Sequence, residues 1–202
     1  MSCTIASTVI DQVVAFHGHR CPGLTIGIRA AELGLREFGP AATTLVAVVE
    51  TDMCGVDAIQ FLTGCTFGKG NLIHLDYGKM AFSFYDRACQ RGLRAVLNQD
   101  VWGGRNGTLT RFMQKMTTGT ATPKEQEAAA ALRADIERTF MELDLNAMFT
   151  ITAMQQPLPR PPRILASLPC AHCGEMTMES RTRRLHGDTL CIPCFEALDR
   201  RI

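Results

Sequence analysis

Two cysteine pairs near the end of the chain constrain its fold more than any other feature. Cys170 and Cys173 are separated by two residues, as are Cys191 and Cys194, and seventeen residues lie between the pairs. Four thiolates at this spacing can complete the tetrahedral shell of a zinc ion (Zn²⁺). A unit of about 35 residues has too small an apolar core to fold without such an ion. The spacing therefore predicts a structural zinc site; redox-active cysteines or an iron–sulfur cluster are the alternatives.

A proline-rich segment divides the chain ahead of these cysteines. Residues 157–162 read PLPRPP, a composition that favours a stiff, extended linker. We expect an α+β core domain over residues 1–156, a linker over 157–168 and a zinc-finger domain over 169–202. The finger is expected to be of the treble-clef or zinc-ribbon kind, with a hairpin at residues 181–188 between its cysteine pairs.

Hydrophobic periodicity and turn residues predict the elements of the core domain. Helices are expected at residues 4–16, 22–38, 56–62 and 123–143, and strands at 44–50, 71–77, 79–86, 93–97 and 149–154. Gly39 and Pro40 should end the second helix, the strands at 79–86 and 93–97 should pair as a hairpin, and residues 102–107 should form a loop. The expected fold is a mixed or antiparallel sheet packed with helices.

A balanced charge argues against two classes of partner. Lysine and arginine total 21 against 20 aspartate and glutamate, for a formal net charge of +1, so no global field attracts nucleic acid or an anionic membrane. The longest apolar run, Leu45–Val49, is far shorter than the ~20 residues of a membrane helix. Nothing near Met1 resembles a signal peptide. We therefore expect a cytoplasmic protein whose nine cysteines are reduced.

A second group of potential metal ligands lies near the N-terminus. His17, His19 and Cys21 alternate within one turn, so two or three of them can point toward one place. Cys21 directly precedes Pro22, the expected first residue of a helix. The helix dipole and the neighbouring Arg20 would both favour its thiolate form.

Two further cysteines follow predicted strands or helices, where binding groups often collect. Cys54 lies between a strand and a helix, and Cys65 lies in a glycine-rich loop. We expect a second metal site, with zinc as the expected ion, in which His17, Cys54 and Cys65 are the first choice of ligands and His19 and Cys21 the alternates. In the competing interpretation, the cysteines are small buried hydrophobes and the histidines bond loop carbonyls.

The glycine-rich loop at residues 64–70 resembles a phosphate-binding P-loop but does not match it. Three residues rather than four separate Gly64 from Gly68, and Gly70 rather than serine or threonine follows Lys69. Nucleotide hydrolysis is therefore not supported. The loop can still present backbone N–H groups to an anion, and Gly68, Lys69, Gly70 and Asn71 are the candidates for that role.

The N-terminal half resembles the FmdE family, the E-subunit proteins of molybdenum formylmethanofuran dehydrogenase. The resemblance rests on FHGHRCPG at 16–23, CGVDAIQ at 54–60 and TGCTFGKGNL at 63–72, together with Gly27, Arg29, Glu50, Asp76, Gly78 and Lys79. It is dense over the N-terminal half and weak over residues 100–156. The cysteine pairs of the tail, with Gly174 and Glu175, resemble the zinc-finger extension of longer members.

The resemblance implies a dimeric α+β core and an association with the enzyme that interconverts carbon dioxide plus methanofuran and formylmethanofuran in methanogenesis. It also favours the second metal site, because its motifs contain all the candidate ligands. The pterin and iron–sulfur chemistry of that oxidoreductase belongs to other subunits. The first hypothesis is accordingly a zinc-binding accessory or subunit protein, whose finger docks a partner.

Two other functions remain open at the level of the sequence, which does not decide whether the chain is an enzyme. In a metalloenzyme, the core metal would activate water or polarise a carbonyl or phosphate, Lys69 would hold an anionic group, and Glu50 or Asp57 would move protons. In a thiol redox or metal-delivery protein, Cys21, Cys54 and Cys65 would carry the chemistry.

Overall fold

The computed structural model describes residues 2–39, 44–154 and 159–200. Backbone contacts divide the chain into two compact units, Met1–Pro161 and Pro162–Ile202. The boundary falls within the segment expected to be the linker. Pro40, predicted to help end the second helix, and Pro157 and Leu158 of the predicted linker lie outside the described residues.

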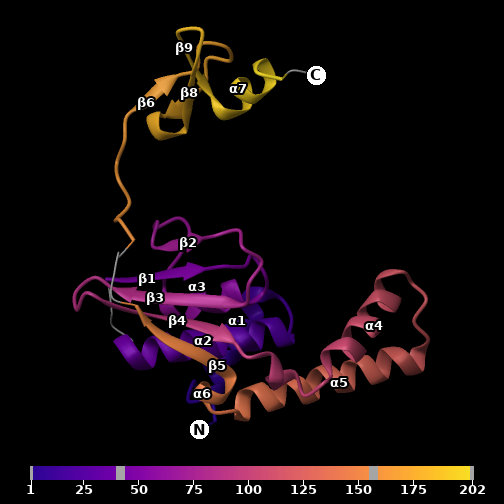
Figure 1. The fold of residues 1–202 in the computed structure, drawn as a ribbon. Helices are drawn as coiled ribbons and strands as arrows, with labels where there is room; N and C mark the ends of the chain where they lie inside the picture. The colour runs from indigo at the N-terminus through magenta and orange to yellow at the C-terminus, as the bar shows by residue number, and fades with distance from the viewer. Residues whose placement is uncertain (1, 40–43, 155–158, 201–202) are drawn as a thin grey trace. The chain divides into compact units, whose positions relative to one another are not determined.

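A five-stranded mixed sheet forms the centre of the first unit (Figure 1). Its strands are β1 (Leu45–Val49), β2 (Leu72–His74), β3 (Ala81–Asp86), β4 (Arg91–Leu97) and β5 (Phe149–Met154). The order is β2-β1-β3-β4-β5, with β1 and β2 parallel and the other neighbours antiparallel. β1 is rich in valine and buried throughout, as suits a strand with neighbours on both sides. The α+β fold and the β3–β4 hairpin are confirmed.

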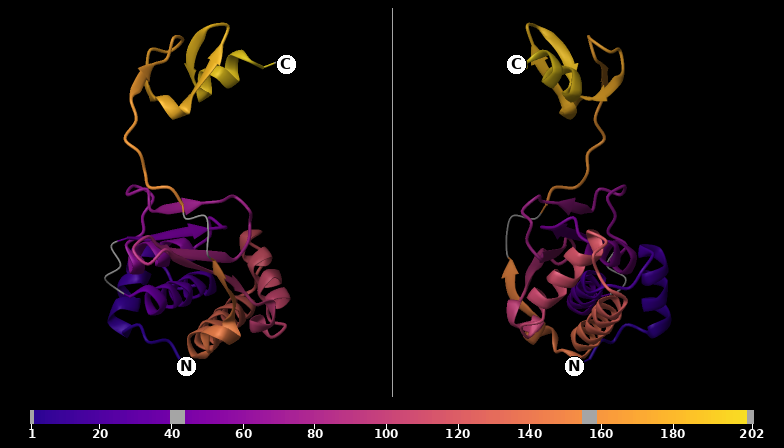
Figure 2. Two further views of the ribbon diagram at one scale, coloured as in Figure 1. Left: turned by 60° about the vertical axis from the view of Figure 1, so that its left-hand side comes forward. Right: turned by 90° about the vertical axis from the view of Figure 1, so that its right-hand side faces the viewer.

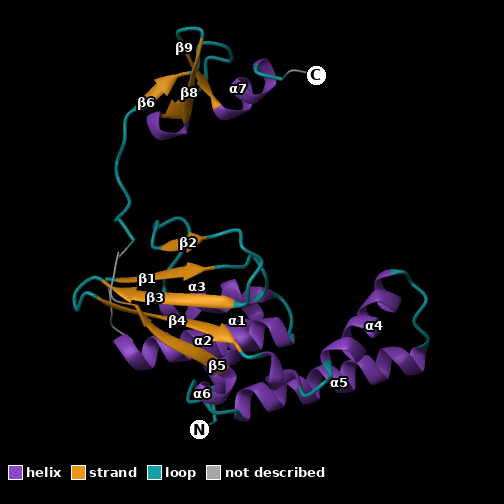
Figure 3. Cartoon of the chain, viewed as in Figure 1, coloured by secondary structure: helices purple, strands orange, loops and turns teal. Residues whose placement is uncertain are grey.

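Helices account for most of the remaining core unit (Figure 3). They are α1 (Ser7–His17), α2 (Pro22–Phe38), α3 (Gly55–Thr63), α4 (Asn106–Thr117), α5 (Pro123–Glu142) and α6 (Leu145–Met148), with a 3₁₀ turn η1 at Gln99–Trp102. One apolar cluster joins Ile26 of α2, Ile59 of α3 and Phe140 of α5 to the inner face of the sheet. Further views show these helices beside the sheet (Figure 2).

The helix α4 corrects the expectation of a loop at residues 102–107. Only residues 103–105 separate η1 from α4. Arg105 holds this tight connection, because its guanidinium donates to the Trp102 carbonyl at 2.9 Å and to Asp135 of α5 at 2.6 Å. α4 and the adjoining end of α5 form a helical hairpin that extends away from the sheet (Figure 1), and α4 has no buried residue.

A buried ion pair fixes α2 to segments that are distant in the sequence. Arg29 Nη1 lies 2.7 Å from Glu32 Oε2, and both side chains are almost fully buried. Thr4 donates its backbone N–H and its hydroxyl to Glu32, while Arg29 Nη2 donates to the Leu143 carbonyl at the end of α5. Buried charges are tolerated only when partners satisfy them, so this network determines how α2 sits in the core.

The second unit consists of two short hairpins followed by a helix. Its elements are β6 (Ser167–Pro169), β7 (Met176–Met178), a 3₁₀ turn η2 (Glu179–Arg181), β8 (Thr182–Leu185), β9 (Asp188–Cys191) and α7 (Ile192–Leu198). β6 pairs with β7, and β8 pairs with β9 across a turn in which His186 and Gly187 have positive φ. The unit has the small zinc-finger form that the cysteine spacing predicts. None of the described helices, in either unit, is long and apolar enough to cross a membrane.

Candidate metal centres

The four tail cysteines converge on one point. The sulfur atoms of Cys170, Cys173, Cys191 and Cys194 all lie within 4.8 Å of one another. Gly174 has a φ of +78°, which allows the tight turn after the first pair, and its N–H donates to the Cys170 carbonyl at 2.9 Å. The Cys191 N–H donates to the Cys170 sulfur at 3.3 Å. Backbone geometry therefore holds the sulfurs ready for a tetrahedral ion.

The acidities of these thiols indicate that the site needs a cation. Backbone N–H groups of Cys173 and Cys191 lower the pKa of Cys170 to about 6. Hydrogen bonding with Cys191 and burial, by contrast, raise the pKa of Cys194 to about 12. Four adjacent thiols cannot all ionise unless a bound cation offsets their charge. Four sulfur donors fit structural zinc, and His172 is exposed and outside this group.

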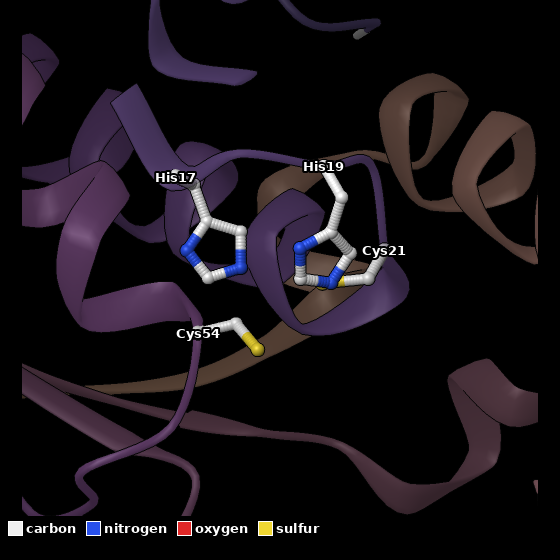
Figure 4. Close-up of side chains that lie close together, drawn as sticks. All are labelled: His17, His19, Cys21 and Cys54. Carbon is white, nitrogen blue, oxygen red and sulfur yellow. The ribbon is translucent and has the colours of Figure 1, made fainter. Parts of the chain in front are cut away.

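A second convergent group lies in the core unit. One nitrogen of His17, one of His19 and the sulfurs of Cys21 and Cys54 lie within 4.8 Å of one another. His17 ends α1, His19 lies in the turn that follows, Cys21 caps α2 and Cys54 caps α3. Figure 4 shows the two imidazole rings side by side, with the Cys54 sulfur pointing toward the space near them. The ring centroids are 4.6 Å apart.

His17 is arranged as a metal-ligating histidine would be. Its Nδ1 lies 2.7 Å from Asp57 Oδ2, and its side chain is only 10% exposed. Its Nε2 is buried without a hydrogen-bond partner among the residues that the structure describes. A histidine that binds a metal usually donates its other ring N–H to a carboxylate, which orients the ring and makes the free nitrogen more basic. Asp57 supplies that carboxylate here.

We expect the Asp57→Ala variant to bind a core metal ion about 10- to 100-fold more weakly than the wild type, because His17 loses the group that orients it. Competition with a chromophoric zinc chelator measures this affinity. Asp52→Ala removes a nearby carboxylate that does not contact His17, and it should leave the affinity within about twofold. Equal affinities of the Asp57 variant and the wild type would show that the pair does not serve the centre.

The crossing of α2 and α3 brings the two core thiols together. A Cβ atom at Gly27 would lie 2.1 Å from the carbonyl oxygen of Gly55, so the two backbones touch here and only glycine fits. Burial and the adjacent Cys54 thiol raise the pKa of Cys21 to about 11. The expectation that Arg20 favours the thiolate is not met, because Arg20 forms an ion pair with Asp11 instead, at 2.6 Å.

A pocket of about 510 Å³ opens beside this group. His17, Cys54 and Asp57 form part of its wall, and Asp52, Met53 and Phe67 form another part. Its volume lies in the range of about 300–1,000 Å³ that small-molecule sites occupy. A ligand in this pocket would therefore lie next to the candidate metal centre.

The structure corrects the first-choice ligand set in one member. Cys65 is fully buried in the apolar core, and its thiol donates to the Leu45 carbonyl at 3.4 Å. It is not part of the convergent group, which contains His19 and Cys21 with His17 and Cys54. Burial also raises the pKa of Cys65, as it does for a core thiol that is not reactive.

The other candidate residues lie apart from the group. Glu50 is buried and accepts two hydrogen bonds from the Arg94 guanidinium, at 2.6 and 2.7 Å, which hold its pKa below the usual value. Lys69 is exposed, and its backbone N–H donates to the Thr66 hydroxyl. Neither residue lines the pocket beside the centre, so the roles expected for them in proton transfer and anion binding have no geometric support there.

Most donors of the glycine-rich loop are used within the loop itself. Gly70 N–H donates to the Phe67 carbonyl at 3.0 Å, and Gly68 is exposed. The Asn71 side chain accepts from the Thr66 N–H at 2.9 Å and donates to the Leu45 carbonyl at 3.1 Å. The loop is a rigid turn between α3 and β2, with few N–H groups left for an anion.

Comparison with known families matches both units. A family model described as FmdE, molybdenum formylmethanofuran dehydrogenase operon, matches residues 16–150. A model of the prokaryotic dksA/traR C4-type zinc finger matches residues 163–200.

Individual relatives agree with these matches. The chain is 26% identical over 188 residues to a probable S-adenosyl-L-methionine-binding protein of Archaeoglobus fulgidus; the alignment covers 89% of this chain and 50% of the relative, so the chain spans about half that protein's length. The crystal structure of a tungsten formylmethanofuran dehydrogenase FmdE-like protein from Syntrophus aciditrophicus shares the fold, with a TM-score of 0.65, 22% identity and 99% coverage of both chains.

Proposed function

Because this chain belongs to the FmdE family, we propose that it is an accessory protein of molybdenum formylmethanofuran dehydrogenase whose core centre holds a divalent metal ion, zinc in the first instance. The tail finger holds a second, structural zinc ion. The observation that carries the core site is the buried, unpartnered Nε2 of His17 beside two thiols, with Asp57 on the opposite ring nitrogen, all within the described part of the chain.

The donor set supports zinc over harder cations. Two imidazoles and two thiols are donors that zinc prefers, whereas calcium and magnesium prefer oxygen. The four groups are not equally protected, because His19 is exposed while His17, Cys21 and Cys54 are partly covered by neighbours. His19 is therefore the ligand that exchanges most easily. A bound ion with an open position would supply Lewis-acid chemistry, which keeps a catalytic role within this proposal.

Metal analysis of purified variants tests the core centre. We expect two zinc ions per wild-type chain and one in His17→Ala, because the buried and oriented ligand is lost. His19→Ala should keep two ions but bind the core ion about tenfold more weakly, and its cobalt-substituted form should respond to added imidazole.

A matched control is His74→Ala, which removes an exposed histidine of the pocket wall that is outside the ligand group. It should retain two ions. A wild-type chain with one ion, or a His17→Ala chain with two, would contradict the proposed core centre.

The proposed partner is tested separately from the metal. The family description supports an association with the molybdenum enzyme, and we propose that the chain binds the other subunits of that enzyme as a homodimer, through its finger. Affinity purification of the tagged full chain from its native host should recover those subunits, and deletion of residues 162–202 should abolish their recovery. Recovery of the chain without them would contradict the accessory role.

The Archaeoglobus relative suggests a second candidate function, binding of S-adenosylmethionine. The pocket beside the centre favours it, because an adenine ring fits its volume and its wall carries carboxylates suited to a cationic sulfonium. Calorimetric titration of the metal-loaded chain with S-adenosylmethionine tests this candidate. Absence of binding at millimolar ligand would exclude it for the half of the relative that this chain spans.

A further inference from the structure

We infer that the pocket beside the core centre selects molecules that join an ammonium group to an aromatic or other apolar body, and that Asp52 and Phe67 determine this selectivity. The inference rests on the proposed function, because the pocket shares His17 and Cys54 with the proposed metal centre. It follows from the charge of the pocket wall and from the apolar side chains at its edge.

The charge of the wall excludes anions and leaves one carboxylate available. Asp52 and Asp57 both line the pocket, and no lysine or arginine among the described residues does. Asp57 is committed to His17. Asp52 is exposed and has no hydrogen-bond or ion-pair partner within the described part of the chain. A free carboxylate without a neighbouring cation attracts an ammonium group and repels a carboxylate or phosphate.

The apolar side chains supply the second half of the specificity. Phe67 is 75% exposed and Met53 is 57% exposed, and both line the pocket. Leaving a phenyl ring in water costs free energy that contact with a ligand would recover. An aromatic ring also attracts a cation through its π face, and a methionine sulfur makes favourable contacts with ring edges.

The backbone around Phe67 is held in place, so the ring is presented at the pocket and not carried on a loose loop. The Phe67 N–H donates to Gln60 Oε1 of α3, and its carbonyl accepts from the Gly70 N–H at 3.0 Å. Gln60 itself lines the pocket. The same short loop therefore ties the aromatic group to the helix that carries Cys54 and Asp57, which keeps the apolar and acidic groups at a fixed spacing.

Titration of the zinc-loaded full chain with small probes tests this selectivity. Benzylamine combines the two groups at neutral pH, and benzoate has the same ring with the opposite charge. We expect saturable binding of benzylamine by ligand-observed NMR and none of benzoate. Asp52→Asn should weaken benzylamine binding by at least about tenfold, because it removes a charge-assisted contact. Phe67→Ala should weaken it by about five- to tenfold.

Phe61→Ala is the matched control, because Phe61 is a partly exposed aromatic residue that packs on Phe16 and does not line the pocket. It should bind benzylamine as the wild type does. Binding of benzoate with equal affinity, or unchanged binding by Asp52→Asn, would overturn the inference. Zinc content is measured on the same samples: two ions without benzylamine binding defeats this inference alone, whereas one ion per chain defeats the proposed core centre.

Discussion

Removal of zinc from the tail is expected to unfold residues 162–202 while the core unit stays folded. The buried cluster of the tail consists of Cys170, Leu190 and Cys191, so two of its three members are themselves ligands. Without the ion, little apolar surface remains to offset the entropy of ordering the chain. Binding of structural zinc is worth roughly 10–16 kcal/mol in comparable fingers. Two-dimensional amide NMR with and without a chelator should show the tail signals collapse to unfolded positions.

Single substitutions separate this effect from a general action of the chelator. Cys191→Ser removes a buried ligand and should leave the tail unfolded even when zinc is present. Limited trypsin digestion should then cut rapidly at Arg181, Arg183 and Arg184. Cys89→Ser is the control, because Cys89 is exposed and outside both ligand groups. Dispersed tail signals in the chelated protein would show that the tail folds without metal.

The tail was predictable because its ligand spacing is a local property. Two residues between cysteines place both sulfurs on one turn in any fold that the chain adopts. The hairpin at residues 181–188 likewise needed only the turn residues His186 and Gly187, which supply the positive φ that the β8–β9 connection requires. Tertiary contacts add little to either inference.

The core needed information that short sequence windows do not contain. α5 was predictable, since Thr122 and Glu125 form a capping box ahead of a run of strong helix formers. α4 was not, because Gly107 and several threonines lower its intrinsic propensity. It forms where Leu109 packs against the core and α5 lies alongside. Packing thus overrides propensity in this segment.

The ligand set shows the same limit at the level of the site. Residues near strand ends include both Cys54 and Cys65, and the sequence pattern does not show which of them faces the histidines. The fold places Cys65 in the core, behind the Leu45 carbonyl. The role of Asp57 did have a signal: it follows Cys54 by three residues, so in the first turn of α3 both can face the same side.

The Gly27→Ala variant is expected to lose the core metal ion. Its new Cβ would meet three backbone atoms of Gly55 at 2.1, 2.4 and 2.6 Å. Backbone cannot turn aside as a flexible side chain can, so α2 and α3 must separate by roughly 1 Å, at a cost of about 1–3 kcal/mol in stability. Cys21 caps the first helix and Cys54 the second, and metal–ligand distances tolerate only about 0.2 Å. We expect core zinc affinity to fall by about 100-fold or more.

Two other glycines grade this prediction and control for it. A Cβ at Gly55 would lie 3.0 Å from the Gly23 carbonyl oxygen, a milder clash, so Gly55→Ala should weaken binding less than Gly27→Ala does. Gly107 lies in α4, where an added Cβ would have nothing within 4 Å, and Gly107→Ala should keep the core ion and gain up to about 1 kcal/mol in stability. Chelator competition and thermal unfolding measure both quantities, and circular dichroism with retention of the tail ion verifies that Gly27→Ala is folded. A folded Gly27→Ala chain with wild-type core affinity would show that the helix crossing does not position the ligands.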